Sequence, residues 1–131
     1  RGRPDVAAVA HPLLDDHPDH AVARRLLAGG SGMVTATLAG DPDRGRRVLG
    51  GLRLIAHAAS LGGIESIACL PAATSHAAVP EAERRRQGIE QNTIRLSLGI
   101  EDAEDLIDDI GRALDRSAPA ADAPEERCAQ S

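Results

Sequence analysis

The sequence predicts an α+β fold, in which one sheet carries helices on one face, and three observations support it. Candidate strands and helices alternate four times along the 131 residues, with no repeat of fixed period. The predicted strands are half polar, which is typical of a sheet with one buried and one open face. The length suffices for one domain of ordinary size. We therefore expect a single α+β domain with its core on one side of the sheet.

The chain begins with a predicted strand, a helix and a second strand. Residues 5–10 (DVAAVA) are short and apolar and predict the first strand. Pro18 suits the first turn of a helix, and Gly29-Gly30 ends that helix. Residues 32–38 (GMVTATL) alternate between two faces and predict the second strand. The apolar face expected for the helix consists of Val22, Leu26 and Leu27.

A longer helix and a third strand follow. Asp41-Pro42 combines an acidic N-cap residue with a proline at the first helical position. The sequence then predicts an apolar helical face that consists of Val48, Leu52, Ile55, Ala56 and Ala59. Gly62-Gly63 interrupts the chain, and residues 64–68 predict the third strand.

The next two elements are a short charged helix and the clearest strand. Pro80 begins the helix and Gly88 ends it. In residues 93–98 (TIRLSL), the isoleucine and the two leucines face one way, while Thr, Arg and Ser face the other. This alternation predicts a strand with one face against the core.

The last predicted helix begins at Glu101-Asp102, where acidic side chains suit the positive end of the helix dipole. Its apolar face consists of Ala103, Leu106, Ile107, Ile110 and Leu114. We expect its polar side to carry Asp105, Asp108 and Asp109. The domain therefore spans residues 1–116, and we expect residues 117–131, which are rich in Ala, Pro, Asp and Glu, to be disordered.

Composition and charge exclude several classes of function. The net charge of −5 argues against a nucleic-acid surface or a basic membrane face. No apolar run approaches the roughly 18 residues of a membrane span. The chain contains no Phe, Tyr or Trp, and all 15 cationic residues are Arg. The core is therefore aliphatic and light, and no lysine-based chemistry can arise within this chain. Two unpatterned cysteines indicate a reducing, cytoplasmic setting.

Two features suit the binding of an anion. Arg95 lies in the middle of the strand predicted for residues 93–98, on its polar face. It is either a bidentate partner for a carboxylate or a solvated arginine on the open side of the sheet. In Ser60-Leu61-Gly62-Gly63, the glycines allow backbone N–H groups to approach an anion beside the Ser60 hydroxyl, although an ordinary helix-to-strand turn has the same pattern.

The remaining polar clusters give weaker signals. His11, His17 and His20 lie within ten residues, but no further ligand is placed with them, and we predict no metal site. The glycine-rich stretch at residues 29–32 lacks the lysine and the following helix of a phosphate loop. Neither a Ser–His–Asp nor a Cys–His arrangement stands out. The residues alone thus predict an anion site and no reaction.

Five short motifs, in this order and spacing, resemble one enzyme family. They are S-L-G-G-I-E-S at residues 60–66, L-P-A at 70–72, S-H-A at 75–77, R-L-S-L-G-I-E-D at 95–102 and E-D-L-I at 104–107. The chain resembles the C-terminal domain of the pyridoxal-phosphate-dependent transsulfuration enzymes from about residue 5 to about residue 115. That family includes cystathionine gamma-synthase, cystathionine gamma-lyase, methionine gamma-lyase and O-acetylhomoserine sulfhydrylase. The resemblance implies the small domain of a fold type I enzyme, with a mostly antiparallel sheet and helices on one face.

The resemblance also implies roles for individual residues. Arg95 matches the arginine that binds the substrate α-carboxylate, and Ser60 matches the serine at the same carboxylate. Ala59 stands where cystathionine enzymes often have Glu, and Ser75 stands in the family's M-T-H motif. These two positions are therefore expected to influence specificity.

The cofactor implied by the family is pyridoxal phosphate (PLP), bound mainly by a large N-terminal domain that these residues do not include. The lysine and the stacked aromatic that the family uses for PLP cannot come from this chain. We therefore expect a fragment of a longer enzyme, inactive by itself, that acts on an amino acid as part of a cytoplasmic homo-oligomer, commonly a tetramer. The alternative is a free-standing, non-catalytic amino-acid-binding or relic domain.

Overall fold

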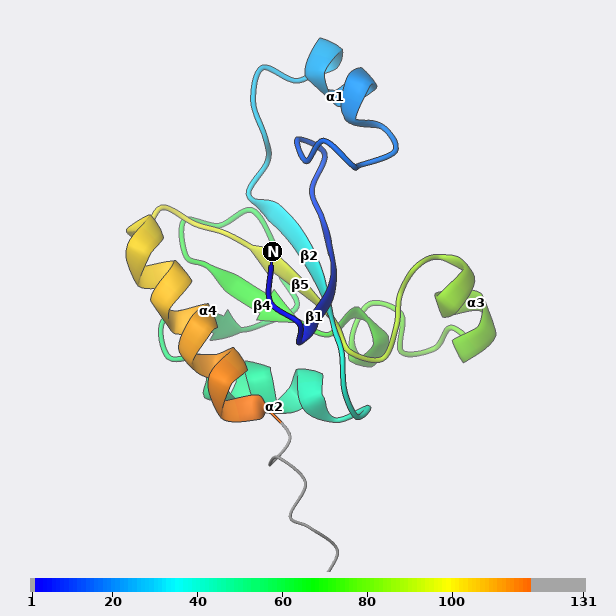
Figure 1. Cartoon of the computed structure of the whole chain (residues 1–131), viewed down its shortest axis with the longest axis vertical. Helices are drawn as coiled ribbons and strands as arrows, with labels where there is room; N and C mark the ends of the chain where they lie inside the picture. Colours follow the sequence, from blue (N-terminus) through cyan, green and yellow to red (C-terminus); the bar gives the residue numbers. More distant parts are fainter. Residues whose placement is uncertain (1, 119–131) are drawn as a thin grey trace, which may run out of the picture.

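Five strands form one sheet in the computed structural model, which describes residues 2–118 (Figure 1). The strands are β1 (Val6–Ala10), β2 (Met33–Leu38), β3 (Ala56–His57), β4 (Ile67–Cys69) and β5 (Thr93–Ser97). Their spatial order is β1-β2-β5-β4-β3. All pairings are antiparallel except that of β3 with β4. The predicted mostly antiparallel α+β fold is confirmed.

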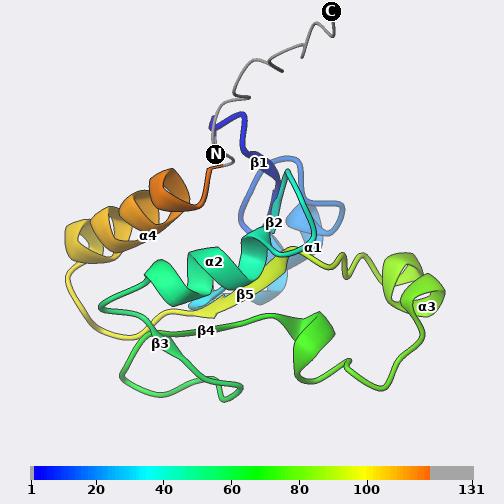
Figure 2. The same ribbon diagram turned by 90° about the horizontal axis from the view of Figure 1, so that it is seen from below.

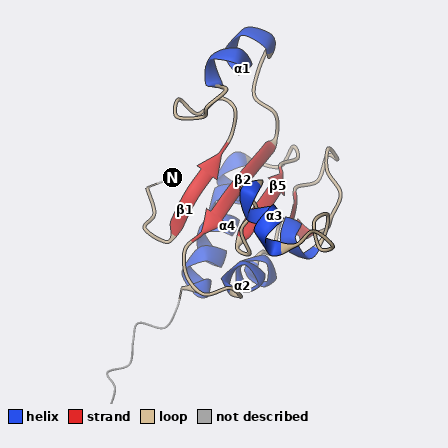
Figure 3. Cartoon of the chain, turned by 90° about the vertical axis from the view of Figure 1, so that its right-hand side faces the viewer, coloured by secondary structure: helices blue, strands red, loops and turns tan. Residues whose placement is uncertain are grey.

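Two of the four α-helices cover one face of this sheet. The helices are α1 (His20–Leu26), α2 (Arg44–Gly51), α3 (Glu81–Arg86) and α4 (Ala103–Ser117), and a short 3-10 helix, η1 (Pro71–Ala73), follows β4. Figures 2 and 3 place α2 and α4 on the same side of the strands, and Figure 1 shows α1 and α3 standing away from the sheet. Within residues 2–118, no helix is long and apolar enough to cross a bilayer.

The core lies between the sheet and the two covering helices. In β5 the side chains of Ile94 and Leu96 are buried, and Leu96 pairs in register with Val34 on one side and Ala68 on the other. Paired residues of an antiparallel sheet share a face, so these aliphatic side chains form rows beneath the helices. The buried cluster consists of Leu38, Val48, Leu49, Ile55, Ala68, Leu70, Ile94, Leu96, Leu106, Ala113 and Leu114.

The second helix is shorter than predicted. We expected its apolar face to continue to Ala59, but α2 ends at Gly51, and residues 56–57 instead pair with β4 as the edge strand β3. The side chain of Asp109 explains the change of direction. Its carboxylate accepts hydrogen bonds from the backbone N–H groups of Arg53, Leu54 and Ile55 at 2.9–3.1 Å. These bonds replace the helical ones and turn the chain toward the sheet.

The prediction that Asp109 lies on the solvated side of the last helix is wrong. The residue is 2 % exposed, because its carboxylate faces the turn that follows α2. Desolvation alone would raise the pKa of Asp109. The three backbone N–H donors and the neighbouring Arg112 outweigh the desolvation, so the pKa is lowered and the group stays ionised.

The apolar side of α1 does not pack into the core. Val22, Leu26 and Leu27 are between 46 % and 73 % exposed. The helix lies on a protruding segment between β1 and β2, beyond one end of the sheet (Figures 1 and 3). Helical periodicity therefore predicted the element correctly but not its environment.

Arg44, the first residue of α2, is buried at 1 % exposure and contacts three separate parts of the chain. Its guanidinium donates to the Asp5 carboxylate at 2.5 Å, to the carbonyls of Asp5 and Ala39 at 2.7 Å, and to the Ser117 hydroxyl at 3.4 Å. Arg3 also donates to Asp5, at 2.9 Å. These donors lower the pKa of Asp5 to about 2, the hydrogen bond from Arg3 contributing most.

The residues beyond α4 lie largely outside the part of the chain that the structure describes. Ser117, the first residue of the predicted disordered tail, is the last residue of α4 and is buried. The prediction for residues 119–131 falls on positions that are not described.

The lowered pKa of Asp5 predicts a specific loss of stability in acid. The pKa is about 2 in the folded chain against an ordinary 3.8, so unfolding takes up a proton as the pH falls from about 4 to about 2. This carboxyl contributes about 2 kcal/mol above that window, and the contribution disappears within it. In denaturant unfolding measured at steps of pH, the free energy of unfolding of Asp5→Asn should fall less steeply between about pH 4 and about pH 2 than that of the parent. The control Asp108→Asn, at an exposed position on α4, should follow the parent, and parallel curves for all three proteins would contradict the assignment.

A second prediction concerns Asp109. The change Asp109→Ala leaves the N–H groups of Arg53, Leu54 and Ile55 without their acceptor and should lower the free energy of unfolding by about 2–4 kcal/mol. The neighbouring exposed change Asp108→Ala should alter it by less than about 0.5 kcal/mol. Equal effects in denaturant melts would show that the carboxylate does not hold this turn.

Candidate functional site

Arg95 lies on the face of the sheet opposite the covering helices. It alternates in β5 with Ile94 and Leu96, which point into the core. Its register partners are Thr35 in β2 and Cys69 in β4, so a strand flanks it on each side. Because β5 is hydrogen-bonded to a strand on each side, the backbone of Arg95 is held rigidly in the sheet.

The guanidinium of Arg95 contacts the predicted glycine-rich loop. Its Nη2 donates to the carbonyl oxygens of Ser60 at 2.9 Å and Ala59 at 3.2 Å. Its Nε is buried without a hydrogen-bond partner, and within residues 2–118 no carboxylate forms an ion pair with this side chain. The structure thus brings Arg95 and the backbone of Ser60 together and leaves the positive charge of Arg95 without an acidic partner among the described residues.

The loop itself crosses the sheet beside Arg95. Ser60 is exposed, and no hydrogen bond of its hydroxyl is found within residues 2–118. The backbone N–H of Gly62 donates to the hydroxyl of Ser97 at 2.9 Å. Gly62 has φ +76°, a left-handed conformation that favours glycine, and this explains the residue at that position.

A second polar cluster holds the end of this loop against the turn after β5. The Glu101 carboxylate accepts from the Ser66 backbone N–H at 2.6 Å and from the Ser66 hydroxyl at 2.7 Å. The Ser66 hydroxyl in turn accepts from the Gly99 N–H at 2.8 Å. The two donors of Ser66 lower the pKa of Glu101, the backbone N–H contributing most. A side chain at Gly99 would collide with the carbonyl oxygen of Ile64, so the close approach of the two turns requires glycine.

The two predicted specificity positions have different surroundings. Ala59 contributes its carbonyl oxygen to Arg95. Ser75 lies after η1, and its hydroxyl contacts Nδ1 of His76 at 2.8 Å. In the described part of the chain, no hydrogen bond joins Ser75 to Arg95 or Ser60.

The histidine and glycine clusters near the N-terminus have local contacts. His11 Nε2 lies 3.0 Å from the Ser31 carbonyl oxygen, and His17 Nδ1 accepts from the backbone N–H of Asp19. Among residues 2–118, no group of three or more His, Cys, Asp or Glu side chains is placed to hold a metal ion.

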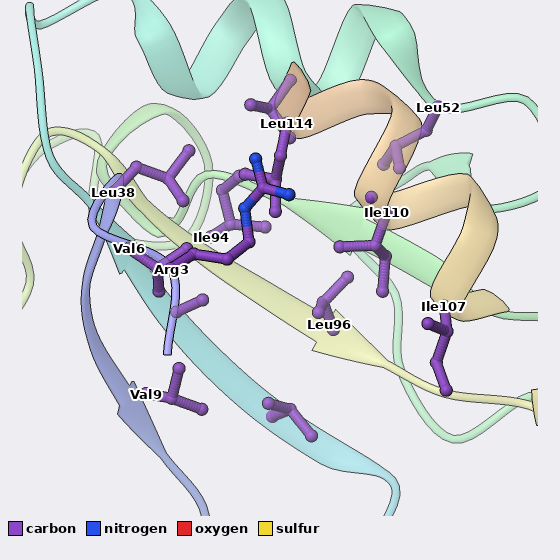
Figure 4. Close-up of a pocket in the computed structure, with 14 residues that line it drawn as sticks. Arg3, Val6, Val9, Leu38, Leu52, Ile94, Leu96, Ile107, Ile110 and Leu114 are labelled. Atoms are coloured by element: carbon purple, nitrogen blue, oxygen red, sulfur yellow. The ribbon is translucent and has the colours of Figure 1, made fainter. Parts of the chain in front are cut away.

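An apolar cavity lies on the other face of the sheet. It occupies about 370 Å³ between α4 and strands β1, β2 and β5 (Figure 4). Its walls are almost entirely aliphatic, and the one charged lining residue, Arg3, pairs with Asp5 and Asp115. The strand β5 therefore separates an apolar groove from the polar site at Arg95, and the groove offers nothing that would bind a carboxylate.

The sequence interpretation overlooked Ser97, Ser66 and Glu101. The signal for Ser97 was its position two residues after Arg95, which places both side chains on one face of the strand. The contact between Ser66 and Glu101 spans 35 positions, and residue pattern alone does not show such a contact.

Comparisons with known proteins identify the family of the chain. Residues 1–115 match the family described as Cys/Met metabolism PLP-dependent enzyme. The chain is 45% identical over 113 residues to cystathionine gamma-lyase of Dictyostelium discoideum, covering 86% of this chain and 29% of that protein. It is 44% identical over 116 residues to cystathionine gamma-lyase of Bos taurus, covering 88% and 29%. The chain therefore spans less than a third of the length of these relatives.

Solved structures show the same fold. A cystathionine gamma-lyase from Micromonospora echinospora superposes with a TM-score of 0.82 at 38% identity, over 88% of this chain and 30% of that one. The enzyme from Lactobacillus plantarum, complexed with L-serine, gives 0.79 at 32% identity, over 87% and 30%. The resemblance predicted from the five motifs is confirmed. The chain belongs to the family of PLP-dependent enzymes of cysteine and methionine metabolism.

Proposed function

We propose that this chain binds the α-carboxylate of an amino-acid substrate within a PLP-dependent transsulfuration enzyme. The observation that carries the proposal is the guanidinium of Arg95, which two backbone carbonyls hold in place and which has no acidic partner in residues 2–118. A planar guanidinium offers parallel N–H donors that match the two oxygens of a carboxylate. The carbonyls of Ala59 and Ser60 occupy Nη2 and Nε is buried, so an incoming carboxylate would contact Nη1 first and would displace one of these carbonyls from Nη2 to bind with both oxygens.

In this proposal Arg95 and Ser60 orient the substrate and transfer no proton. Holding the carboxylate fixes the direction of the Cα–H bond relative to the cofactor, which is a positioning contribution to catalysis. The exposed Ser60 hydroxyl supplies a further donor at the same side of the sheet. The reaction class we propose for the whole enzyme is elimination or γ-replacement on sulfur or O-acyl amino acids. The names of the relatives favour cleavage of cystathionine within that class.

The residues of this chain do not by themselves fit PLP. The cofactor would supply an electron sink when bound, and this chain contains no lysine to hold it and no aromatic side chain to stack on its ring. The proposal therefore assigns cofactor binding to another part of a longer enzyme. It also assigns that enzyme to a cytoplasmic homo-oligomer, a tetramer in the commonest case, because members of the family share these properties.

The first test is the affinity of the chain for amino acids. L-cystathionine titrated into ¹⁵N-labelled chain should shift the backbone amide signals of Arg95 and of residues 60–63. Arg95→Gln should weaken binding about tenfold or more, because a hydrogen-bonded charge pair contributes roughly 1.5–3 kcal/mol. The control Arg46→Gln removes an exposed arginine of α2 and should not change the affinity. Equal affinity of Arg95→Gln and the parent would refute the proposal.

A second test concerns activity. The 131-residue chain supplied with PLP and L-cystathionine should release no more α-keto acid or thiol than PLP and L-cystathionine release without the chain. The reason is that the chain contains no lysine to hold the cofactor. The assay distinguishes a chain that is inactive alone from one that is a complete enzyme. Release of either product above the background rate would contradict the assignment of catalysis to a missing part, while carboxylate binding without turnover agrees with it.

A further inference from the structure

We propose that Ser97 is a positioning residue that holds the loop of residues 60–63 at the carboxylate site. The proposal rests on the carboxylate-binding function proposed for Arg95. It starts from how little apolar contact this loop makes. Leu61 is 58 % exposed and Ile64 is 72 % exposed, so burial of these side chains does not fix the loop on the sheet. Its position must therefore depend on polar contacts of the backbone.

Two side chains of β5 provide these contacts in the middle of the loop. Arg95 donates to the carbonyls of Ala59 and Ser60, and the hydroxyl of Ser97 accepts from the N–H of Gly62. Both side chains lie on the same face of the strand because they are two residues apart. The strand β5 thus bonds both the carbonyls at the start of the loop and the N–H of Gly62 in its middle.

The burial of Ser97 makes its hydroxyl a fixed acceptor. The residue is 3 % exposed, and its register partners are Met33 in β2 and Ile67 in β4. Its backbone cannot shift without disturbing two strand pairings, so the N–H of Gly62 is held at a defined height above the sheet. In residues 2–118, Ser97 is the one side chain that bonds a backbone N–H within residues 60–63.

The far end of the loop is fixed independently. Ser66 bonds Glu101 and Gly99, and the Ile100 N–H donates to the Ile64 carbonyl at 2.9 Å. Loss of the Ser97 hydroxyl would leave these contacts and the sheet in place. It would release only the segment between Ser60 and Gly63, where the Ser60 carbonyl holds Arg95. The predicted consequence is a less ordered guanidinium and weaker carboxylate binding, with little change in the fold.

The experiment compares three variants of the 131-residue chain. Ser97→Ala removes the acceptor, Ser97→Thr retains a hydroxyl, and Thr37→Val removes a hydroxyl from the same face of the sheet, where Thr37 lies 3.1 Å from Thr93 Oγ1. L-cystathionine binding is measured by NMR titration. Amide hydrogen exchange is measured at Gly62 and at Leu96 in β5.

Ser97→Ala should raise the Kd for L-cystathionine by roughly 3- to 30-fold and speed exchange at Gly62, while Leu96 stays protected. Ser97→Thr should restore the affinity and the Gly62 protection, and Thr37→Val should leave both unchanged. Faster exchange at Gly62 with an unchanged Kd overturns the proposal, because the loop position then has no effect on binding. Loss of protection at Leu96 together with Gly62 also overturns it, because the role is then structural.

Different outcomes would reject the proposed carboxylate binding and the proposed role of Ser97. If the parent chain does not bind L-cystathionine, or if Arg95→Gln binds as tightly as the parent, carboxylate binding itself is wrong and the role of Ser97 falls with it. If the parent binds and Arg95→Gln does not, a failure confined to the Ser97 variants rejects only the positioning role.

Discussion

One buried guanidinium, that of Arg44, holds the elements of this fold in their relative positions. It contacts the residue before β1, the residue after β2 and the last turn of α4, and it lies itself at the first residue of α2. Removing any acceptor would leave a charge in the interior with fewer partners, which is costly. The chain has no aromatic residue to fill its core, so aliphatic packing contributes less area than usual. Polar contacts such as those of Arg44 and Asp109 therefore decide where the helices end and how they meet the sheet.

The position of Arg95 depends on the register in which β5 pairs with its neighbours in the same sheet. In β5, alternation places Leu96 under the helices and Arg95 on the opposite face, and pairing with β2 and β4 on both sides fixes that assignment. A slip of one residue would exchange the two faces and bury the guanidinium. The rigidity of the site thus comes from the strand, whereas the loop of residues 60–63 adds its backbone groups from outside the sheet.

The sequence was informative wherever a local pattern decides the structure. Alternation was enough to locate β5 and the outward side of Arg95, and the motifs from Ser60 to Asp102 identified the family. The end of α2 could not be predicted, because apolar spacing continues past Gly51 and the group that stops the helix, Asp109, lies 54 to 56 positions away from its partners. Ser97 looked like an ordinary polar residue of an open face, since its partner Gly62 is brought to it only by the folded sheet. The apolar side of α1 suggested core packing, but periodicity does not say which surface a helix meets.

The ion pair between Arg3 and Asp115, at 2.6 Å, brings the beginning of β1 and the last turn of α4 together. This contact spans 112 positions of the sequence, so the segment before β1 and the last turn of α4 are neighbours in the fold. The strand pairings of the sheet therefore do not depend on the order in which the elements follow one another along the chain. A short flexible connector from the last turn of α4 to the segment before β1, with a new opening at the exposed turn around Gly29, would retain each strand pairing in a circularly permuted form of residues 3–115 that begins with β2.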